Sequence, residues 1–142
     1  MSKLISAQTA GNVLLVLFGL LAVFHILIAL NLFPSTIVWG GRAGSSPNPG
    51  TFLVISLVLN VLFAIVVAAK MGYIEVGSFS KVLNILLWII FAYLLLNTAG
   101  NLASKSSFET LLFTPITIVA AFLVLRLAIQ LKDSIRKNVL AF

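Results

Sequence analysis

The chain has no cysteine, one histidine and only three acidic residues among its 142 positions. Without cysteine there are no disulfides, no thiol redox chemistry and no thiolate metal sites. A metal centre within one chain is also not expected, because protein-bound metal ions need several His, Cys, Asp or Glu ligands. We therefore expect a protein without a metal or other cofactor.

Charge is scarce as well, since 8% of the residues are charged and 61% are hydrophobic. The mean hydropathy is +1.21. A soluble domain carries roughly a quarter charged residues, so this composition is typical of a protein in lipid. The net charge of +6 does not indicate nucleic-acid binding, because the basic residues are scattered beside apolar runs. Membrane lipid is the expected partner, and nucleic acid is not.

Four apolar runs are each long enough for a helix that crosses the roughly 30 Å bilayer core, which takes about 20 residues. They are residues 12–33, 51–70, 82–100 and 110–131. The first run is too long for a signal-peptide core and no cleavage site follows it, so we expect it to be retained. Short connections favour an all-α, four-transmembrane-helix up-down bundle, formed as one membrane domain over residues 1–142 with an outer loop at 34–50.

The lysines and arginines predict the orientation of this bundle, because they concentrate on the cytoplasmic side of membrane proteins. Seven fall on the side of both termini, if Arg126 reaches toward its nearer membrane face: Lys3, Lys70, Lys81, Arg126, Lys132, Arg136 and Lys137. Arg42 and Lys105 fall on the other side. Both termini are therefore expected in the cytoplasm. The basic stretch LKDSIRKN should continue the fourth helix and anchor it to anionic lipid.

Polar side chains within the runs are few and follow a pattern. Tyr93, Asn97 and Asn101 are spaced by four residues, so they form one stripe that runs to the outer end of the third helix. His25 and Asn60 both lie roughly 12–14 Å below the outer boundary, at 1.5 Å per residue, and are expected to meet at one level. For His25, a neutral hydrogen-bonded core residue and a proton carrier or ligand contact both stay open.

The other polar residues of the runs are interpreted as contacts that hold helices together. They are Ser56, Asn84, Thr98, Thr110, Thr114 and Thr117. Pro115 removes a backbone donor from the fourth helix, and Thr114 is expected to help satisfy the group that this leaves free. A kink there would open space beneath the outer loop.

Glu109 has two interpretations at the start of the fourth helix. Ser106 and Glu109 have the spacing of a capping box, in which the serine caps the helix and the glutamate reaches back to the serine amide. An ion pair between Arg42 and Glu109, closing the outer mouth of the bundle, fits the same placement.

The loop sequence IVWGGRAG also contains residues that could anchor the loop at the membrane interface or bind an anion. Trp39 is typical of an interfacial aromatic belt. Gly40 and Gly41 permit left-handed backbone, and their amides beside Arg42 could bind an anion such as phosphate, sulfate or carboxylate. The alternative is an ordinary turn with a pairing arginine.

Three segments, IVWGGR after the first run, NTAGNLASKSSFE leaving the third and FTPIT opening the fourth, resemble an uncharacterised family of small four-span bacterial membrane proteins. The resemblance covers most of the chain and is strongest at residues 25–42 and 84–117. It implies a protein of the bacterial cytoplasmic (inner) membrane, in which these two segments form one site. It implies no activity, substrate or cofactor.

Together these features predict a binding protein rather than an enzyme. We expect a polar pocket, open to the outer face, that binds a small amphiphile, a lipid or an anionic group. Its expected residues are His25, Trp39, Arg42, Asn60, Tyr93, Asn97, Asn101 and Glu109. The alternatives are a transporter or channel assembled as a homo-oligomer, an accessory subunit of a membrane complex, and a lipid-modifying enzyme with His25 as its general base.

Overall fold

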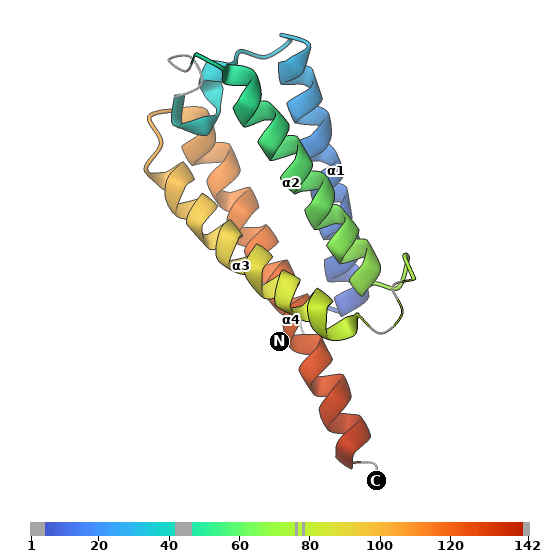
Figure 1. Ribbon diagram of the computed structural model, residues 1–142. Helices are drawn as coiled ribbons and strands as arrows, with labels where there is room; N and C mark the ends of the chain where they lie inside the picture. Colours follow the sequence, from blue (N-terminus) through green and yellow to red (C-terminus); the bar gives the residue numbers. More distant parts are fainter. Residues whose placement is uncertain (1–4, 42–46, 76, 78, 141–142) are drawn as a thin grey trace.

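The computed structural model describes residues 5–41, 47–75, 77 and 79–140. Four long helices account for most of this part of the chain (Figure 1). They are α1 (Ala7–Ala29), α2 (Pro49–Lys70), α3 (Ser80–Leu102) and α4 (Thr114–Leu140). A 3-10 helix, η1 (Ser35–Ile37), precedes α2, and a π-helix, η3 (Glu109–Phe113), leads into α4. The described residues include no β-strand, so the expected all-α fold is confirmed.

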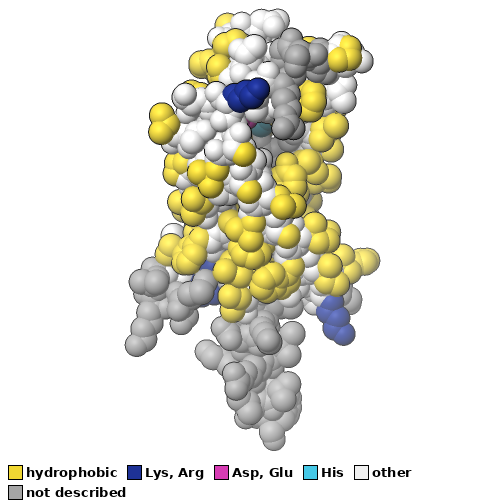
Figure 2. All heavy atoms as spheres, turned by 90° about the vertical axis from the view of Figure 1, so that its left-hand side faces the viewer, with side chains coloured by type: hydrophobic (Ala, Val, Ile, Leu, Met, Phe, Trp, Pro, Cys, Tyr) yellow, Lys and Arg dark blue, Asp and Glu magenta, His cyan; other side chains and the backbone are white. Residues whose placement is uncertain are grey.

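All four long helices are long and apolar enough to cross a membrane, counting η3 with α4. Their exposed side chains are largely apolar; Leu96 and Leu111, for example, are 74% and 78% exposed. On the face that Figure 2 draws, hydrophobic side chains form a broad band, and the lysine and arginine side chains that are visible lie toward its two ends. A surface of this kind is stable only against lipid. The chain is therefore an integral membrane protein.

The boundaries of α1 differ from those of the apolar run at 12–33. The helix begins at Ala7, because the Ser6 hydroxyl accepts a 3.0 Å hydrogen bond from the Thr9 amide and so caps it. It ends at Ala29, because Asn31 adopts the left-handed conformation with φ 57° and closes the last turn. Apolar content alone contains neither of these local signals.

The connections alternate between the two ends of the bundle (Figure 1). Residues 30–41, 47–48 and 103–108 lie at one end, which we call the loop end. The α2–α3 connection lies at the other, N-terminal end, together with the start of α1. There the Arg126 Nε donates a 3.1 Å hydrogen bond to the Ile5 carbonyl, so this side chain does reach toward that end. The helix α4 continues beyond the bundle, as the basic tail predicted.

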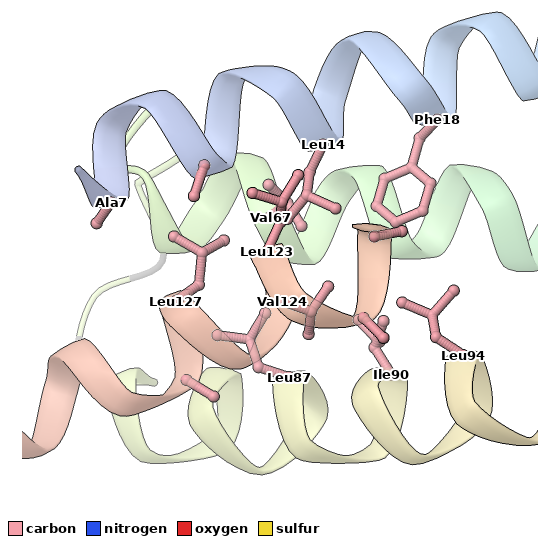
Figure 3. Close-up of a cluster of buried hydrophobic side chains, with 14 residues drawn as sticks. Ala7, Leu14, Phe18, Val67, Leu87, Ile90, Leu94, Leu123, Val124 and Leu127 are labelled. Carbon is pink, nitrogen blue, oxygen red and sulfur yellow. The ribbon is translucent and has the colours of Figure 1, made fainter. Parts of the chain in front are cut away.

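The half of the bundle near the N-terminal end is a closely packed apolar core (Figure 3). Its largest fully buried side chains come from all four helices: Leu14, Val67, Leu87, Val124 and Leu127. Alanines at positions 10, 121 and 128 let the backbones approach one another, as in other membrane bundles. This core fills one half of the bundle and leaves the loop end to the polar side chains.

The start of α4 is wider than an ordinary helix. In η3 the Thr114 amide donates to the Glu109 carbonyl, a π-type bond placed directly before Pro115. The expected role of Thr114 is wrong, because its hydroxyl has no hydrogen-bond partner within the described residues. The Thr117 hydroxyl instead lies 2.9 Å from the Phe113 carbonyl. The π turn therefore accommodates the proline through the backbone.

Candidate binding site

A cavity of about 140 Å³ lies between the four helices, in the half of the bundle toward the loop end. Its walls are mainly Leu, Ile and Phe side chains. Every predicted site residue that the structure describes lines it: His25, Trp39, Asn60, Tyr93, Asn97, Asn101 and Glu109. Arg42 lies outside the described residues. The helical spacings have thus brought together side chains from α1, α2, α3 and the loop end.

The His25 ring is half-buried in the cavity wall. Its Nδ1 lies 2.6 Å from the Leu21 carbonyl oxygen, which can only accept, so Nδ1 carries a proton. In the neutral ring, Nε2 is then left as a hydrogen-bond acceptor. The ring also lies 6.1 Å from that of Trp39, measured between centroids. His25 is thus a hydrogen-bonded residue and a wall of the cavity at once.

Trp39 is turned toward α2. Its indole N–H donates a 2.9 Å hydrogen bond to the Ser56 hydroxyl, and its ring lies 6.1 Å from that of Phe52. Trp39, Gly40 and Gly41 all have positive φ, at 55°, 68° and 72°. This left-handed run folds the loop back over the bundle. Ser56, predicted only as a helix contact, is the group that fastens the loop to α2.

Glu109 is buried, with 6% of its surface exposed. Its Oε2 accepts a 2.7 Å hydrogen bond from the Gly40 amide and a second bond from the Ser104 hydroxyl. The glycine turn, predicted as an anion site, therefore holds a carboxylate of the protein itself. The predicted pairing of Glu109 with Arg42 lies outside the described residues.

The capping box predicted for Ser106 and Glu109 is half formed. The Ser106 Oγ lies 3.5 Å from the Glu109 amide, as the cap requires. The second bond of a capping box, from the Ser106 amide to the Glu109 carboxylate, is replaced by two others. The Ser106 amide donates to the Ser104 hydroxyl at 2.9 Å, and the Glu109 carboxylate accepts from the Gly40 amide. The Ser106 hydroxyl also donates to the Ile37 carbonyl at 2.9 Å. The start of the fourth span thus binds the loop at two points.

Two buried amides face the cavity. Asn60 and Asn101 line it and are each only 7% exposed. The Asn101 Nδ2 is buried and has no hydrogen-bond partner among the described residues. A buried polar group without a partner costs about 1–3 kcal/mol. Native structures rarely keep one unless a bound molecule or an ion satisfies it.

A second, wider pocket of about 520 Å³ opens at the loop end, and we call it the loop pocket. It shares Trp39, Asn97, Asn101 and Glu109 with the cavity. Its own residues include Ser104, Lys105 and the two loop glycines. In Figure 2 a hollow near the upper end, beside a lysine, shows histidine and acidic atoms inside it. The two spaces are therefore neighbours, with the polar residues between them.

Sequence reasoning missed the aromatic part of the cavity wall. Phe24, Phe63 and Phe113 line it. The sequence did contain a pattern that indicates them. Phe63 follows Asn60 by three positions and Phe113 follows Glu109 by four, so each phenylalanine lies on the same helical face as the polar residue before it. Asn84, predicted as a helix contact, does not line the cavity. No group of three His, Cys, Asp or Glu side chains that could hold a metal occurs in the part of the chain that the structure describes.

The chain matches no protein-family model, no curated protein and no solved structure. The resemblance of its three segments to a family of four-span bacterial membrane proteins therefore stays a prediction. Any function has to be argued from the cavity itself.

Proposed function

We propose that this membrane protein binds a small amphiphile, with its apolar part in the cavity and its polar or anionic head group in the loop pocket. The observation that carries the proposal is the Asn101 amide, which is buried at the junction of the two spaces and has an unpartnered Nδ2. A head group placed there would supply the missing hydrogen bond. Leu, Ile and Phe side chains offer the apolar part a dry surface.

The volumes of the cavity and the loop pocket support a ligand whose apolar part lies in the first and whose head group lies in the second. A cavity of about 150 Å³ is enough for one small aromatic molecule, whereas drug-sized ligands occupy roughly 300–1,000 Å³. The cavity, at about 140 Å³, therefore suits a short apolar segment. The loop pocket is larger, and Lys105 gives it a cation for a head group.

The charge distribution supports a location for this site. Seven of the nine lysines and arginines belong to the side of the termini. By the positive-inside rule, that side is cytoplasmic and the loop pocket opens to the outer face. We assign the protein to the bacterial cytoplasmic membrane on the resemblance of its motifs.

The proposal is tested by lipid-dependent stability. Delipidated protein in detergent is titrated with phosphatidylglycerol, phosphatidylethanolamine or a long-chain fatty acid, and its melting temperature is measured. We expect at least one of them to raise the melting temperature, because a ligand that binds only the folded state stabilises it. The rise should be smaller for Asn97→Ala, which changes an exposed side chain of the cavity lining.

The matched control is Ser107→Ala, an exposed position outside both spaces. It should respond as the unmodified protein does. Equal responses of all three proteins to every amphiphile would contradict a pocket at this place.

One observation favours a second candidate, a lipid-modifying enzyme. The His25 Nδ1 is taken up by the Leu21 carbonyl, which leaves Nε2 of the neutral ring as an acceptor that could take a proton from a substrate hydroxyl or water. A labelled lipid would be incubated with the protein in vesicles and its products separated. Turnover that is lost in His25→Ala would favour the enzyme. If the unmodified protein shows no turnover, or if His25→Ala leaves turnover unchanged, the enzyme hypothesis is wrong.

A further inference from the structure

We infer that the amphiphile reaches the cavity sideways from the bilayer, through an opening between α2 and α3. This inference rests on the proposed function and adds the route and the source of the ligand. The ligand is then a lipid of the leaflet at the loop end, with one acyl chain passing between the two helices.

The exposure of the cavity wall locates the opening. Among the described residues that line the cavity, Tyr93 and Asn97 are exposed and the others are buried or half-buried. Tyr93 and Asn97 lie one turn apart on α3. The Tyr93 ring meets the ring of Phe63 on α2 edge-on, at 5.2 Å between centroids. The exposed part of the wall therefore lies where α3 faces α2.

The packing of the helices agrees with this position. Among neighbouring helices, α2 and α3 touch each other least. Figure 1 shows them diverging toward the loop end. On the opposite side of α3, Thr98 and Thr117 join it to α4 by a 2.8 Å hydrogen bond between their hydroxyls. The α3–α4 side is thus closed at the level where the α2–α3 side is open.

The chemistry of the opening suits a lipid. An exposed amide within a span is costly against hydrocarbon, and yet Asn97 lies beside the exposed Leu95 and Leu96. A lipid head group or ester at this level would hydrogen-bond it. Tyr93 has an apolar ring and a polar tip, the combination found where apolar and polar surroundings meet. The Phe63–Tyr93 pair then forms the lower edge of the opening.

A route from water through the loop pocket is less open. Trp39 and Glu109 line both spaces, and the bond from the Gly40 amide to Glu109 fixes the loop between them. Trp39, Gly40 and Glu109 therefore separate the cavity from the aqueous phase. On the bilayer side, the rings of Phe63 and Tyr93 form the contact between α2 and α3 at this level.

The two tryptophans of the chain provide the test. Trp39 lines the cavity, whereas Trp88 is 44% exposed on α3 and does not line it. Trp88→Phe leaves Trp39 as the only reporter, and Trp39→Phe leaves Trp88. Each protein is placed in phosphatidylcholine vesicles, with or without a lipid brominated on one acyl chain near the head group. Quenching by bromine and by water-soluble acrylamide is then measured.

We expect the brominated lipid to quench Trp39, although this ring is half-buried, and acrylamide to quench it weakly. Adding Asn97→Phe, which fills the opening, should remove most of the quenching of Trp39 by the brominated lipid. Adding Phe63→Ala, which widens the opening, should increase it. Quenching of Trp88 by the brominated lipid should stay the same with either change, which also shows that the variants are folded in the bilayer.

Acrylamide quenching of Trp39 that exceeds quenching by the brominated lipid would overturn the lateral route in favour of access from water. The lateral route would also be overturned if neither Asn97→Phe nor Phe63→Ala altered the quenching of Trp39 by the brominated lipid. Neither result removes the pocket, which is judged separately by the lipid-dependent melting temperature of Asn97→Ala.

Discussion

The backbone N–H of Gly40 donates a 2.7 Å hydrogen bond to the Oε2 of Glu109, 69 positions further along the chain. This bond joins the loop before α2 to the beginning of the fourth span. Gly40 has φ 68°, a conformation that glycine adopts without steric cost. The glycine turn and the glutamate are therefore one structural unit, and it lies between the cavity and the loop pocket.

Glu109→Gln should loosen the loop. A hydrogen bond to a charged group contributes about 1.5–3 kcal/mol, and the neutral amide oxygen of glutamine accepts more weakly. We expect a lower free energy of unfolding and faster hydrogen exchange at the Gly40 amide. Glu75→Gln is the control, because Glu75 is exposed and lies in the α2–α3 connection. Equal exchange at Gly40 in both variants would show that the bond does not hold the loop.

The architecture could be predicted because bilayer thickness fixes the length of an apolar helix. Helix ends depended on contacts that hydropathy does not describe, such as the Ser6 cap and the left-handed Asn31. Spacing by three or four residues correctly grouped Tyr93, Asn97 and Asn101, because helical geometry alone decides which side chains share a face.

The partners of Glu109 and Thr114 could not be predicted in the same way. A capping box is a local pattern, but the Glu109 carboxylate is taken by Gly40 from a distant loop. The Thr114 hydroxyl was assigned to the backbone freed by Pro115, but the π turn at η3 changes which carbonyls are free. At Glu109 a tertiary contact overrides the local pattern, and at Thr114 a local π-helical turn does so.

The hydroxyl pair between Thr98 and Thr117 should stabilise the contact of α3 with α4 only modestly. Both residues are buried, and their oxygens lie 2.8 Å apart. Hydrogen bonds between transmembrane helices average about 0.6 kcal/mol and reach about 1.7. A double-mutant cycle with Thr98→Val and Thr117→Val should give a coupling energy in this range. A coupling of zero would mean that each hydroxyl is satisfied by its own helix backbone, through Leu94 and Phe113.

Two glycines of α1 should respond differently to a larger side chain. A Cβ at Gly11 would overlap the thioether of Met71, with 2.7 Å to its Cγ, whereas a Cβ at Gly19 meets nothing within 4 Å. We expect Gly11→Leu to displace Met71 and lower the free energy of unfolding by about 1–3 kcal/mol, the usual cost of overpacking. Gly19→Leu should be neutral or stabilising, since leucine favours helix. Equal melting temperatures for the two variants would contradict this packing of α1.

Asn101→Leu should separate stability from binding. Leucine branches at Cγ as asparagine does and carries no polar atom, so it removes the buried Nδ2 that lacks a partner. The ligand-free protein should gain about 1–3 kcal/mol, the cost of an unsatisfied buried group, and its melting temperature should rise. Its further stabilisation by the amphiphile should be lost, because the junction of the cavity and the loop pocket no longer offers a hydrogen bond.

Asn84→Leu is the matched comparison for this change. The Asn84 Oδ1 is also buried without a hydrogen-bond partner in the described part of the chain, but Asn84 lines neither space. Its replacement should raise the melting temperature of the ligand-free protein and leave the response to the amphiphile intact. An amide at the junction of the two spaces that costs stability and binds a ligand trades stability for binding. If Asn101→Leu destabilises the ligand-free protein, or if both variants respond to the amphiphile alike, Asn101 serves the fold and not the ligand.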